Sequence, residues 1–243
     1  MISVLDLCLD IDLKLNKQAS VEHQSIPNEN KIVFLNQAQI KLIKKKVNTN
    51  NNYQLGFDAF LKRYEDLQGL VVPYTALNVT DVGDKLNSYT ADITALPVDK
   101  KYLFPIDIYV LADQGCCTDR LLNVIDIVRH ADITRLFYES NWMPNFAWQE
   151  TLATISDNKI YVYSDESKSF TINKLYLSYL RYPRKIDIAG YFHLDGTASS
   201  DVDCELPEYL RDELVDLAIQ EIAMATENQT AVQYTIQRNK ENE

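Results

Sequence analysis

Apolar residues in the first quarter of the chain recur with helical spacing. Between Ile32 and Val47 the stripe formed by Leu35, Ala38 and Leu42 repeats every three or four residues, which is typical of an amphipathic helix. A second stripe with the same spacing runs from Phe57 to Leu67. Both segments are therefore predicted to be helices that pack against a core.

The start of the chain gives a less clear pattern. From Leu5 to Leu15 every second residue is Leu or Ile. Strict alternation is the signature of a half-buried strand, but the segment is also long enough for a helix. The residues alone leave both interpretations open.

The middle of the chain, about Leu70 to Tyr191, is rich in β-branched and aromatic residues and is broken by turn residues. This composition predicts short antiparallel strands. Asp157-Asn158 suits a tight hairpin and Gln114 to Thr118 a looser one. The predicted strands are Leu70–Val72, Tyr102–Ala112, Leu121–Arg129, Thr151–Ile155, Lys159–Tyr163 and Phe170–Tyr182.

The last quarter contains an acidic segment with helical apolar spacing, which begins at Glu205. Pro207 stands near the first turn, where its missing N–H has no helical partner to lose. An apolar stripe of this kind has to be buried against another element. Its members are Leu206, Leu210, Leu214, Leu217, Ala218, Ile222 and Ala225.

Composition places the chain among ordinary globular proteins. It has 243 residues, of which 46% are apolar, so it can bury a sizeable core. No apolar run approaches the roughly 18 residues that span a bilayer, and the start lacks the pattern of a secretory signal. We therefore expect the chain to fold in the cytosol. Its four cysteines include no Cys-x-x-Cys pair, which indicates neither a disulfide framework nor a zinc site.

The net charge of −11 is unevenly distributed. Residues 205–243 carry nine acidic and three basic side chains, whereas residues 31–46 carry five lysines and no acid. The simpler interpretation is two solvated helix faces. The alternative is that the two faces meet between neighbouring subunits, where complementary charge sets the register of association.

Signatures of common catalytic sites are missing. The six glycines form no phosphate-binding loop or dinucleotide fingerprint, and neither Gly-x-Ser-x-Gly nor His-Glu-x-x-His occurs. A thiol site built from His130, Asp132 and Cys116 or Cys117 is conceivable, but a structural histidine is the simpler interpretation. We expect no catalytic residue, although a thiol or carboxylate hydrolase is kept as a minor alternative.

No metal or other cofactor is expected either. The loop that carries Asp195, Asp201, Asp203 and Glu205 offers oxygen ligands that could hold calcium. Its spacing matches no EF-hand, and Asp195-Gly196 is more simply a turn. Direct nucleic-acid binding is also weakly indicated, because the lysines of Lys41–Lys46 lack interleaved aromatic residues. An acidic surface can still serve DNA, since a pore lined with carboxylates repels phosphate.

Four segments in the same order resemble virion structural proteins of tailed bacteriophages, in particular the head–tail connector (ring or adaptor) proteins of short-tailed, crAss-like phages. The resemblance covers about Pro27 to Glu227, and none of its motifs is a catalytic signature. The four segments are Val33–Ile43, Asn141–Thr151, Leu177–Ile186 and Leu206–Ala218.

The resemblance implies an α+β fold, in which N- and C-terminal helices form a bundle that carries a β-rich antiparallel insertion. The expected organisation is a helical region at residues 1–68, the insertion at 69–191, and an acidic helix with a polar tail at 192–243 that packs with the first region. By this resemblance we also expect Leu5 to Leu15 to be helical.

The same resemblance implies a virion protein at the head–tail interface, assembled in the bacterial cytoplasm as a ring of about twelve copies. Its expected partners are further copies of the chain, the portal above, tail or other ring proteins below, and double-stranded DNA that passes through without sequence-specific binding; no membrane is expected. The alternative is another virion part, such as a tail hub, a different ring layer or a minor capsid component. The residues expected at interfaces are Lys41, Lys44, Lys45, Lys46, Arg181, Arg184, Lys185, Glu208, Arg211, Asp212, Glu213 and Asp216.

Overall fold

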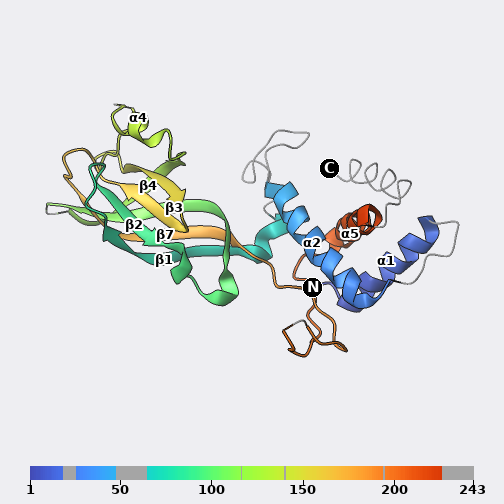
Figure 1. The fold of residues 1–243 in the computed structure, drawn as a ribbon. Coiled ribbons are helices and arrows are strands. Elements are labelled where there is room, and N and C mark those ends of the chain that lie inside the picture. The colour runs from blue at the N-terminus through green and yellow to red at the C-terminus, as the bar shows by residue number, and fades with distance from the viewer. Residues whose placement is uncertain (19–25, 48–64, 116, 140, 194, 226–243) are drawn as a thin grey trace. The chain divides into compact units, whose positions relative to one another are not determined.

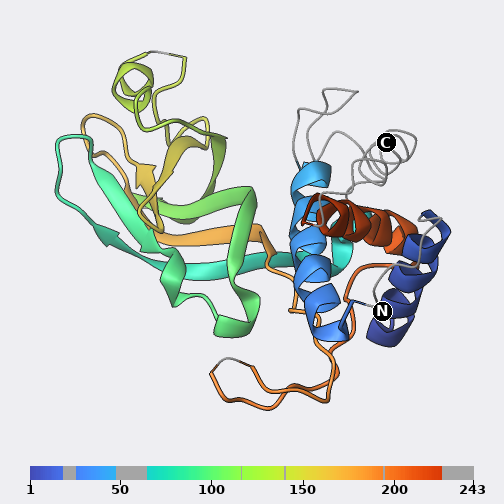
Figure 2. The same cartoon turned by 45° about the vertical axis from the view of Figure 1, so that its right-hand side comes forward.

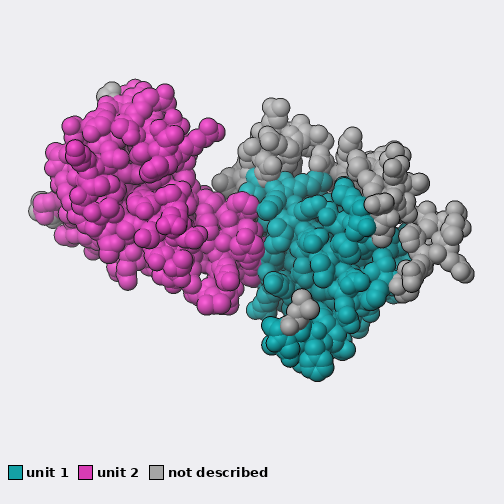
Figure 3. All heavy atoms as spheres, in the orientation of Figure 1, with its two compact units in different colours: residues 1–69, 183–243 teal, residues 70–182 magenta. Residues whose placement is uncertain are grey.

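The computed structural model describes residues 1–18, 26–47, 65–115, 117–139, 141–193 and 195–225. The chain forms two compact units (Figure 3). Unit 1 consists of residues 1–69 and 183–243, and unit 2 consists of residues 70–182. The predicted domain boundaries, after residues 68 and 191, stay predictions.

Unit 2 is a closed barrel of seven strands (Figures 1 and 2). Around the barrel the order is β1-β2-β6-β5-β4-β3-β7, and β7 pairs with β1 to close it. The strands are β1 (Val71–Asp81), β2 (Ser88–Asp92), β3 (Tyr102–Gln114), β4 (Cys117–Ile127), β5 (Glu150–Ser156), β6 (Lys159–Tyr163) and β7 (Thr171–Arg181).

Alternating side chains fill the barrel interior. In β7, Leu175, Leu177 and Tyr179 are completely buried, as expected because every second residue of a strand faces the same side. Tyr179 keeps its hydroxyl satisfied by donating a hydrogen bond to the Lys100 carbonyl at 2.8 Å. The long pairing of β3 with β7 joins these residues to the fully buried Val110 of β3.

Hairpins form at both predicted positions, but the second is not the looser one expected, because Gln114 pairs directly with Cys117. Asp157 and Asn158 both adopt left-handed backbone angles, with φ of 50° and 56°, which is the conformation of a tight turn that matches strand twist. They connect β5 to β6. Gly115, with φ of 58°, lies at the turn between β3 and β4.

The predicted fold class, a helical bundle with a β-rich antiparallel insertion, is wrong. The described residues instead form mainly strands closed into a barrel, with less α-helix than strand. The strands are also not all antiparallel, because β4 and β5 run in parallel. A parallel pair needs a long crossover, which here contains helix α4 (Ile133–Phe137) and the aromatic connection Trp142–Trp148. Closure and crossover both depend on pairings between distant segments, which local patterns do not show.

Unit 1 contains the helices α1 (Val4–Gln18), α2 (Asn28–Val47) and α5 (Arg211–Ala225), the last preceded by the short helix η5 (Glu208–Leu210). In both ribbon views α5 lies between α1 and α2 (Figures 1 and 2). The loop from Pro183 to Pro207 connects β7 to η5 and is held as an irregular hairpin by single bridges.

Helix α1 confirms the helix that the resemblance implied for Leu5 to Leu15, against the alternation. In a helix, residues two positions apart point to nearly opposite sides, because each residue turns the chain by about 100°. The alternating residues therefore split into two stripes. Leu7, Ile11 and Leu15 are buried, whereas Leu5, Leu9 and Leu13 are exposed.

Helix α5 differs from the amphipathic helix that its sequence predicts. Most of the predicted stripe is buried, although Ala225 is exposed. The acidic Glu213 and Asp216 are also buried, so the helix is enclosed on several sides and has no continuous acidic face. Its central place between α1 and α2 explains this, because each neighbour covers a different side.

Several predictions fall on parts of the chain that the structure does not describe. These are the second helical stripe up to Tyr64, the polar tail after Ala225 and Cys116; Leu67, the last member of that stripe, is described and buried. The described helices include none that is both long and apolar enough to cross a membrane.

Candidate subunit interface

Most of the charged residues predicted to lie at interfaces belong to unit 1, on α2 and α5. The structure pairs many of them with opposite charges of the same chain. The meeting of basic and acidic segments that was considered between subunits thus occurs within one subunit, and the assignment of these residues to an interface stays a prediction.

The most enclosed ion cluster joins the end of α2 to the start of α5. Lys46 contacts Glu213 at 2.9 Å and Asp66 at 3.1 Å, and Lys45 approaches Glu213 at 3.5 Å. The side chains of Lys46 and Glu213 are only 12% and 8% exposed. Burial lowers the pKa of Lys46, but the nearby carboxylates of Glu213 and Asp66 outweigh it and raise that pKa above its usual value. This cluster holds two helices of unit 1 together.

A second cluster joins α1 to α5. Lys14 contacts Asp212 at 3.1 Å and the fully buried Asp216 at 3.0 Å. One turn earlier, Arg211 contacts Asp10 at 2.6 Å and also approaches Glu208 at 3.4 Å. Sequence reasoning missed Lys14 and Asp10, because their partners are about 200 residues away.

The other predicted residues lie nearer the surface. Lys41 pairs with Glu221 of α5, and Arg184 contacts Glu205 at 3.3 Å. Lys44 and Lys185 are exposed in unit 1. Arg181 ends β7 in unit 2 and donates to the Tyr182 carbonyl at 3.3 Å.

A groove that sequence reasoning missed lies between α2 and the loop that follows β7. Its volume is about 750 Å³. The side chain of Asn36 fixes the two walls, because it donates to the Ile186 carbonyl and accepts from the Ile186 N–H, both at 2.9 Å. The lining is mainly apolar and includes charged groups. It includes Ile32, Val33, Ile40, Lys41, Lys185, Ile186, Asp187, Tyr191, His193 and Val202.

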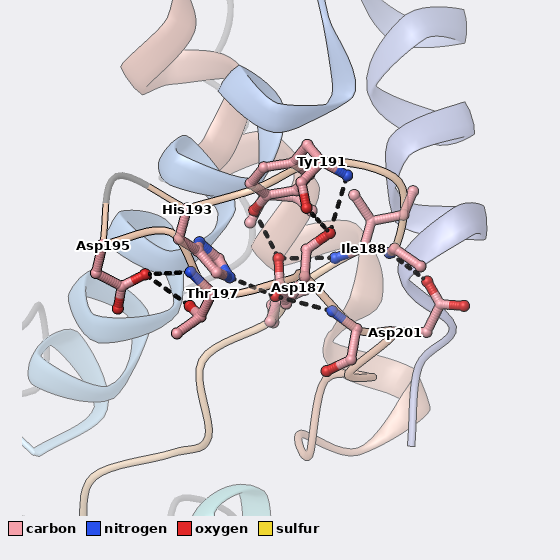
Figure 4. Close-up of polar contacts among 12 residues, drawn as sticks. Asp187, Ile188, Tyr191, His193, Asp195, Thr197 and Asp201 are labelled. Atoms are coloured by element: carbon pink, nitrogen blue, oxygen red, sulfur yellow. Dashed lines mark hydrogen bonds and ion pairs between the residues drawn. The ribbon is translucent and has the colours of Figure 1, made fainter.

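Asp187 organises the loop side of the groove (Figure 4). One carboxylate oxygen accepts from the Tyr191 hydroxyl at 2.6 Å and from the Ile188 N–H at 2.9 Å, and the other lies 3.0 Å from the His193 ring. Partial burial raises the pKa of Asp187, but these hydrogen bonds lower it below its usual value overall. The hydrogen bond to Asp187 raises the pKa of Tyr191 to about 12. The loop is therefore held in one shape by an ionised carboxylate.

The acidic loop considered for calcium uses its carboxylates separately. Asp195 accepts from the Thr197 N–H and hydroxyl, Asp201 from the Ala189 N–H, and Asp203 from the Val4 N–H. Glu205 pairs with Arg184, as described above. Within the described residues, no three His, Cys, Asp or Glu side chains gather as metal ligands do.

The thiol site considered for His130 is only partly described. His130 and Asp132 lie in the turn before α4, and Cys117 is an exposed free thiol at the start of β4. Cys116 lies outside the described residues.

The exposed stripe on α1, formed by Leu5, Leu9 and Leu13, is the second surface that sequence reasoning missed. Its signal was present in the alternation of apolar residues, which was interpreted only as a choice between strand and helix. In a helix the same pattern gives two apolar sides, of which the core covers one.

Comparison with known proteins adds the family. Among curated proteins, none matches the chain. A family model described as phage tail ring protein 3/4 matches residues 5–234, almost the whole chain. The chain therefore belongs to this crAss ring 3/4 family of phage tail ring proteins, and is a structural ring component of the virion.

Proposed function

We propose that the chain is a head-to-tail adaptor subunit, which assembles as a ring below the portal, bridges the portal to the tail and forms part of the DNA channel. The observation that carries the proposal is the family match over residues 5–234. The resemblance of four ordered segments to connector proteins supports the position next to the portal. The expected copy number is about twelve, and we assign the ring no catalytic step.

A ring subunit needs two different lateral surfaces that fit each other around a rotation axis, and axial surfaces for its neighbours above and below. The described part of unit 1 offers candidates for the lateral pair in the groove of α2 and the leucine stripe of α1. Arg184, Lys185 and Lys44 are exposed side chains of the same unit, and we propose them for contacts with other ring or portal proteins.

The net charge of −11 suits a channel that DNA must pass without adhering. The structure narrows which acidic residues of the C-terminal segment are available for this purpose. Glu213 and Asp216 are buried within unit 1, whereas Glu208 and Asp212 have exposed side chains. We therefore propose that Glu208 and Asp212, rather than the whole segment, contribute to the charge of the channel.

A second candidate is a ring layer further along the tail, without contact to the portal. The family description favours it, because it names a tail ring and mentions no portal. Both candidates share ring formation, and they differ in which proteins lie above and below.

The decisive experiment is to locate the chain in intact virions by cryo-electron microscopy and to test binding of the purified chain to purified portal. The adaptor proposal predicts density directly below the portal with about twelvefold symmetry, and binding to portal in solution. Density separated from the portal by another ring, together with no binding, would instead support the tail-layer candidate.

A further inference from the structure

Helix α1 exposes an apolar stripe that no described part of the chain covers. Leu5, Leu9 and Leu13 are 60%, 56% and 58% exposed, and their spacing of four places them on one side of the helix. Isolated surface leucines are ordinary, but contiguous apolar side chains along a helix mark interaction sites. The stripe is a regular ridge of the kind that packs into a groove.

The groove of α2 is an apolar hollow in the same unit. Val33 and Ile40 line it from α2, and Val33 is 53% exposed. Ile186 and Val202 line it from the loop. Because the loop is held by Asn36 and by the Asp187 network, the groove exists before any partner binds, which reduces the entropy lost on binding.

The two surfaces carry opposite charge at their edges. Asp6 and Asp12 flank the leucine stripe, and the Asp12 side chain remains 41% exposed although it contacts Lys31. Lys41 and Lys185 are among the lining residues of the groove; Lys41 also pairs with Glu221 of α5, and Lys185 is exposed. The acidic residue of the groove, Asp187, is already engaged by its own loop. The acidic residues beside the stripe and Lys185 beside the groove are thus of opposite sign, and complementary charge of this kind favours and orients association.

We propose that the leucine stripe of α1 in one copy of the chain packs into the α2 groove of the next copy. The stripe and the groove are different surfaces, so each copy uses one toward each neighbour. Such a head-to-tail contact produces a ring when its rotation closes, whereas a self-complementary surface produces a dimer. The inference deepens the proposed function and rests on ring formation, but not on docking to the portal.

Cysteine cross-linking in phage particles tests the contact in the assembled ring. The starting chain carries Cys116→Ser and Cys117→Ser, so that neither residue reacts with the reagent. Cys8 and Cys204 are kept because they are buried. Leu9→Cys and Val33→Cys are then introduced together, and the particles are treated with a short bis-maleimide reagent. We expect a ladder of covalent dimers, trimers and higher multimers, because every copy carries both partners. Each single variant is expected to yield only monomer.

A matched control combines Leu9→Cys with Val98→Cys, since Val98 is 85% exposed on unit 2, and we expect no ladder from it. Absence of a ladder from the Leu9–Val33 pair would overturn the proposal. So would a dimer from Leu9→Cys alone, which would indicate stripe-to-stripe packing, or a link to a different virion protein, which would assign the stripe to that partner.

A second measurement does not depend on the reagent. Leu9→Glu adds an acidic residue within the stripe and is expected to lower the incorporation of the chain into particles at least tenfold, with unchanged helix content and melting temperature of the purified chain. Normal incorporation would overturn the contact. Failure of the adaptor proposal is distinguishable, because it would leave the ladder intact while the ring fails to bind portal.

Discussion

At the scale of single residues, the charged side chains of α2 have different roles although they are neighbours in sequence. Lys46 is enclosed by Glu213 and Asp66, whereas Lys44 is exposed. Removing one partner of a charge pair that is shielded from water leaves the other charge buried without compensation, which destabilises the fold. Charge reversal across Lys44–Lys46 would therefore disturb the fold as well as any interface, and Lys44 alone is the suitable position for testing association.

Lys46→Met is expected to lower the free energy of unfolding by about 3–5 kcal/mol. It leaves the carboxylate of Asp66 buried without the Lys46 cation, and leaves Glu213 with only the longer contact to Lys45 at 3.5 Å. Lys44→Met is the matched control and is expected to change it by less than about 0.5 kcal/mol. Urea unfolding followed by circular dichroism measures both. Equal effects of the two substitutions would contradict the enclosed cluster.

Asp187 gives a prediction of pH dependence. Its pKa is lowered in the folded chain, so its ionised form stabilises the loop at pH values above its ordinary pKa of 3.8. That contribution is lost as the pH falls through the lowered value. Asp187→Asn is expected to reduce stability at neutral pH and to weaken the loss of stability in acid, as measured by melting temperature between pH 7 and pH 2. Parallel pH profiles of the variant and the parent would show that Asp187 contributes nothing of this kind.

At the scale of elements, the alternating apolar residues of α1 form two separate surfaces of one helix, one buried and one exposed. Leu7, Ile11 and Leu15 pack into unit 1, and the residues two positions before each of them remain exposed. The pattern of apolar and polar residues alone cannot distinguish such a helix from a strand, because strict alternation is also the pattern expected of a half-buried strand. Helix α1 forms because its buried stripe has α5 to pack against.

Leu7→Ala and Leu9→Ala separate the two sides of α1. Leu7 is completely buried, so its truncation is expected to cost about 2–5 kcal/mol of unfolding free energy. Leu9→Ala is expected to change that free energy by less than about 0.5 kcal/mol, and to weaken ring assembly instead. Denaturant unfolding and particle incorporation are the two measurements. A large loss of stability from Leu9→Ala would show that the exposed stripe serves the fold.

The sequence predicted local elements better than their arrangement. Helix α2, the hairpin at Asp157-Asn158 and strand β6 follow from patterns within a few residues. Strand β2 was missed because its five residues carry no long apolar run, and the end of β1 because Asn78 and Asp81 interrupt its apolar pattern. Barrel closure and the crossover between β4 and β5 need partners far apart in sequence, which no local pattern specifies.

The candidate site was predictable to a similar extent. The basic and acidic segments were identified from charge, but their pairing inside one chain depends on the position of α5 between α1 and α2. Lys14 lies outside the lysine run of residues 41–46, and Glu221 is one of several acidic residues in the C-terminal segment. Composition alone therefore could not show that Lys14 pairs with Asp216 or that Glu221 pairs with Lys41. The groove needed the loop after β7 to be placed against α2, which only the structure provides.

At the scale of the whole molecule, unit 2 has the properties of a segment that folds by itself. Its core cluster lies within unit 2 and consists mainly of barrel residues, and its first and last strands are hydrogen-bonded neighbours, with Val71 opposite Leu180. The two points where the chain enters and leaves the barrel are therefore adjacent. A barrel also leaves no open strand edge that would have to be covered by other parts of the chain.

We expect residues 70–182, expressed alone, to form a folded barrel with strand-rich circular dichroism and a single cooperative unfolding transition. The complementary chain, residues 1–69 joined to 183–243 by a short glycine-serine linker, is expected to retain the helices, because the linker has only to span the adjacent strand ends. If the leucine stripe and the groove form the ring contact, this helical chain should also associate with itself, whereas the barrel should remain monomeric. An unfolded barrel segment would contradict its independence, and a self-associating barrel would move the main subunit contact to unit 2.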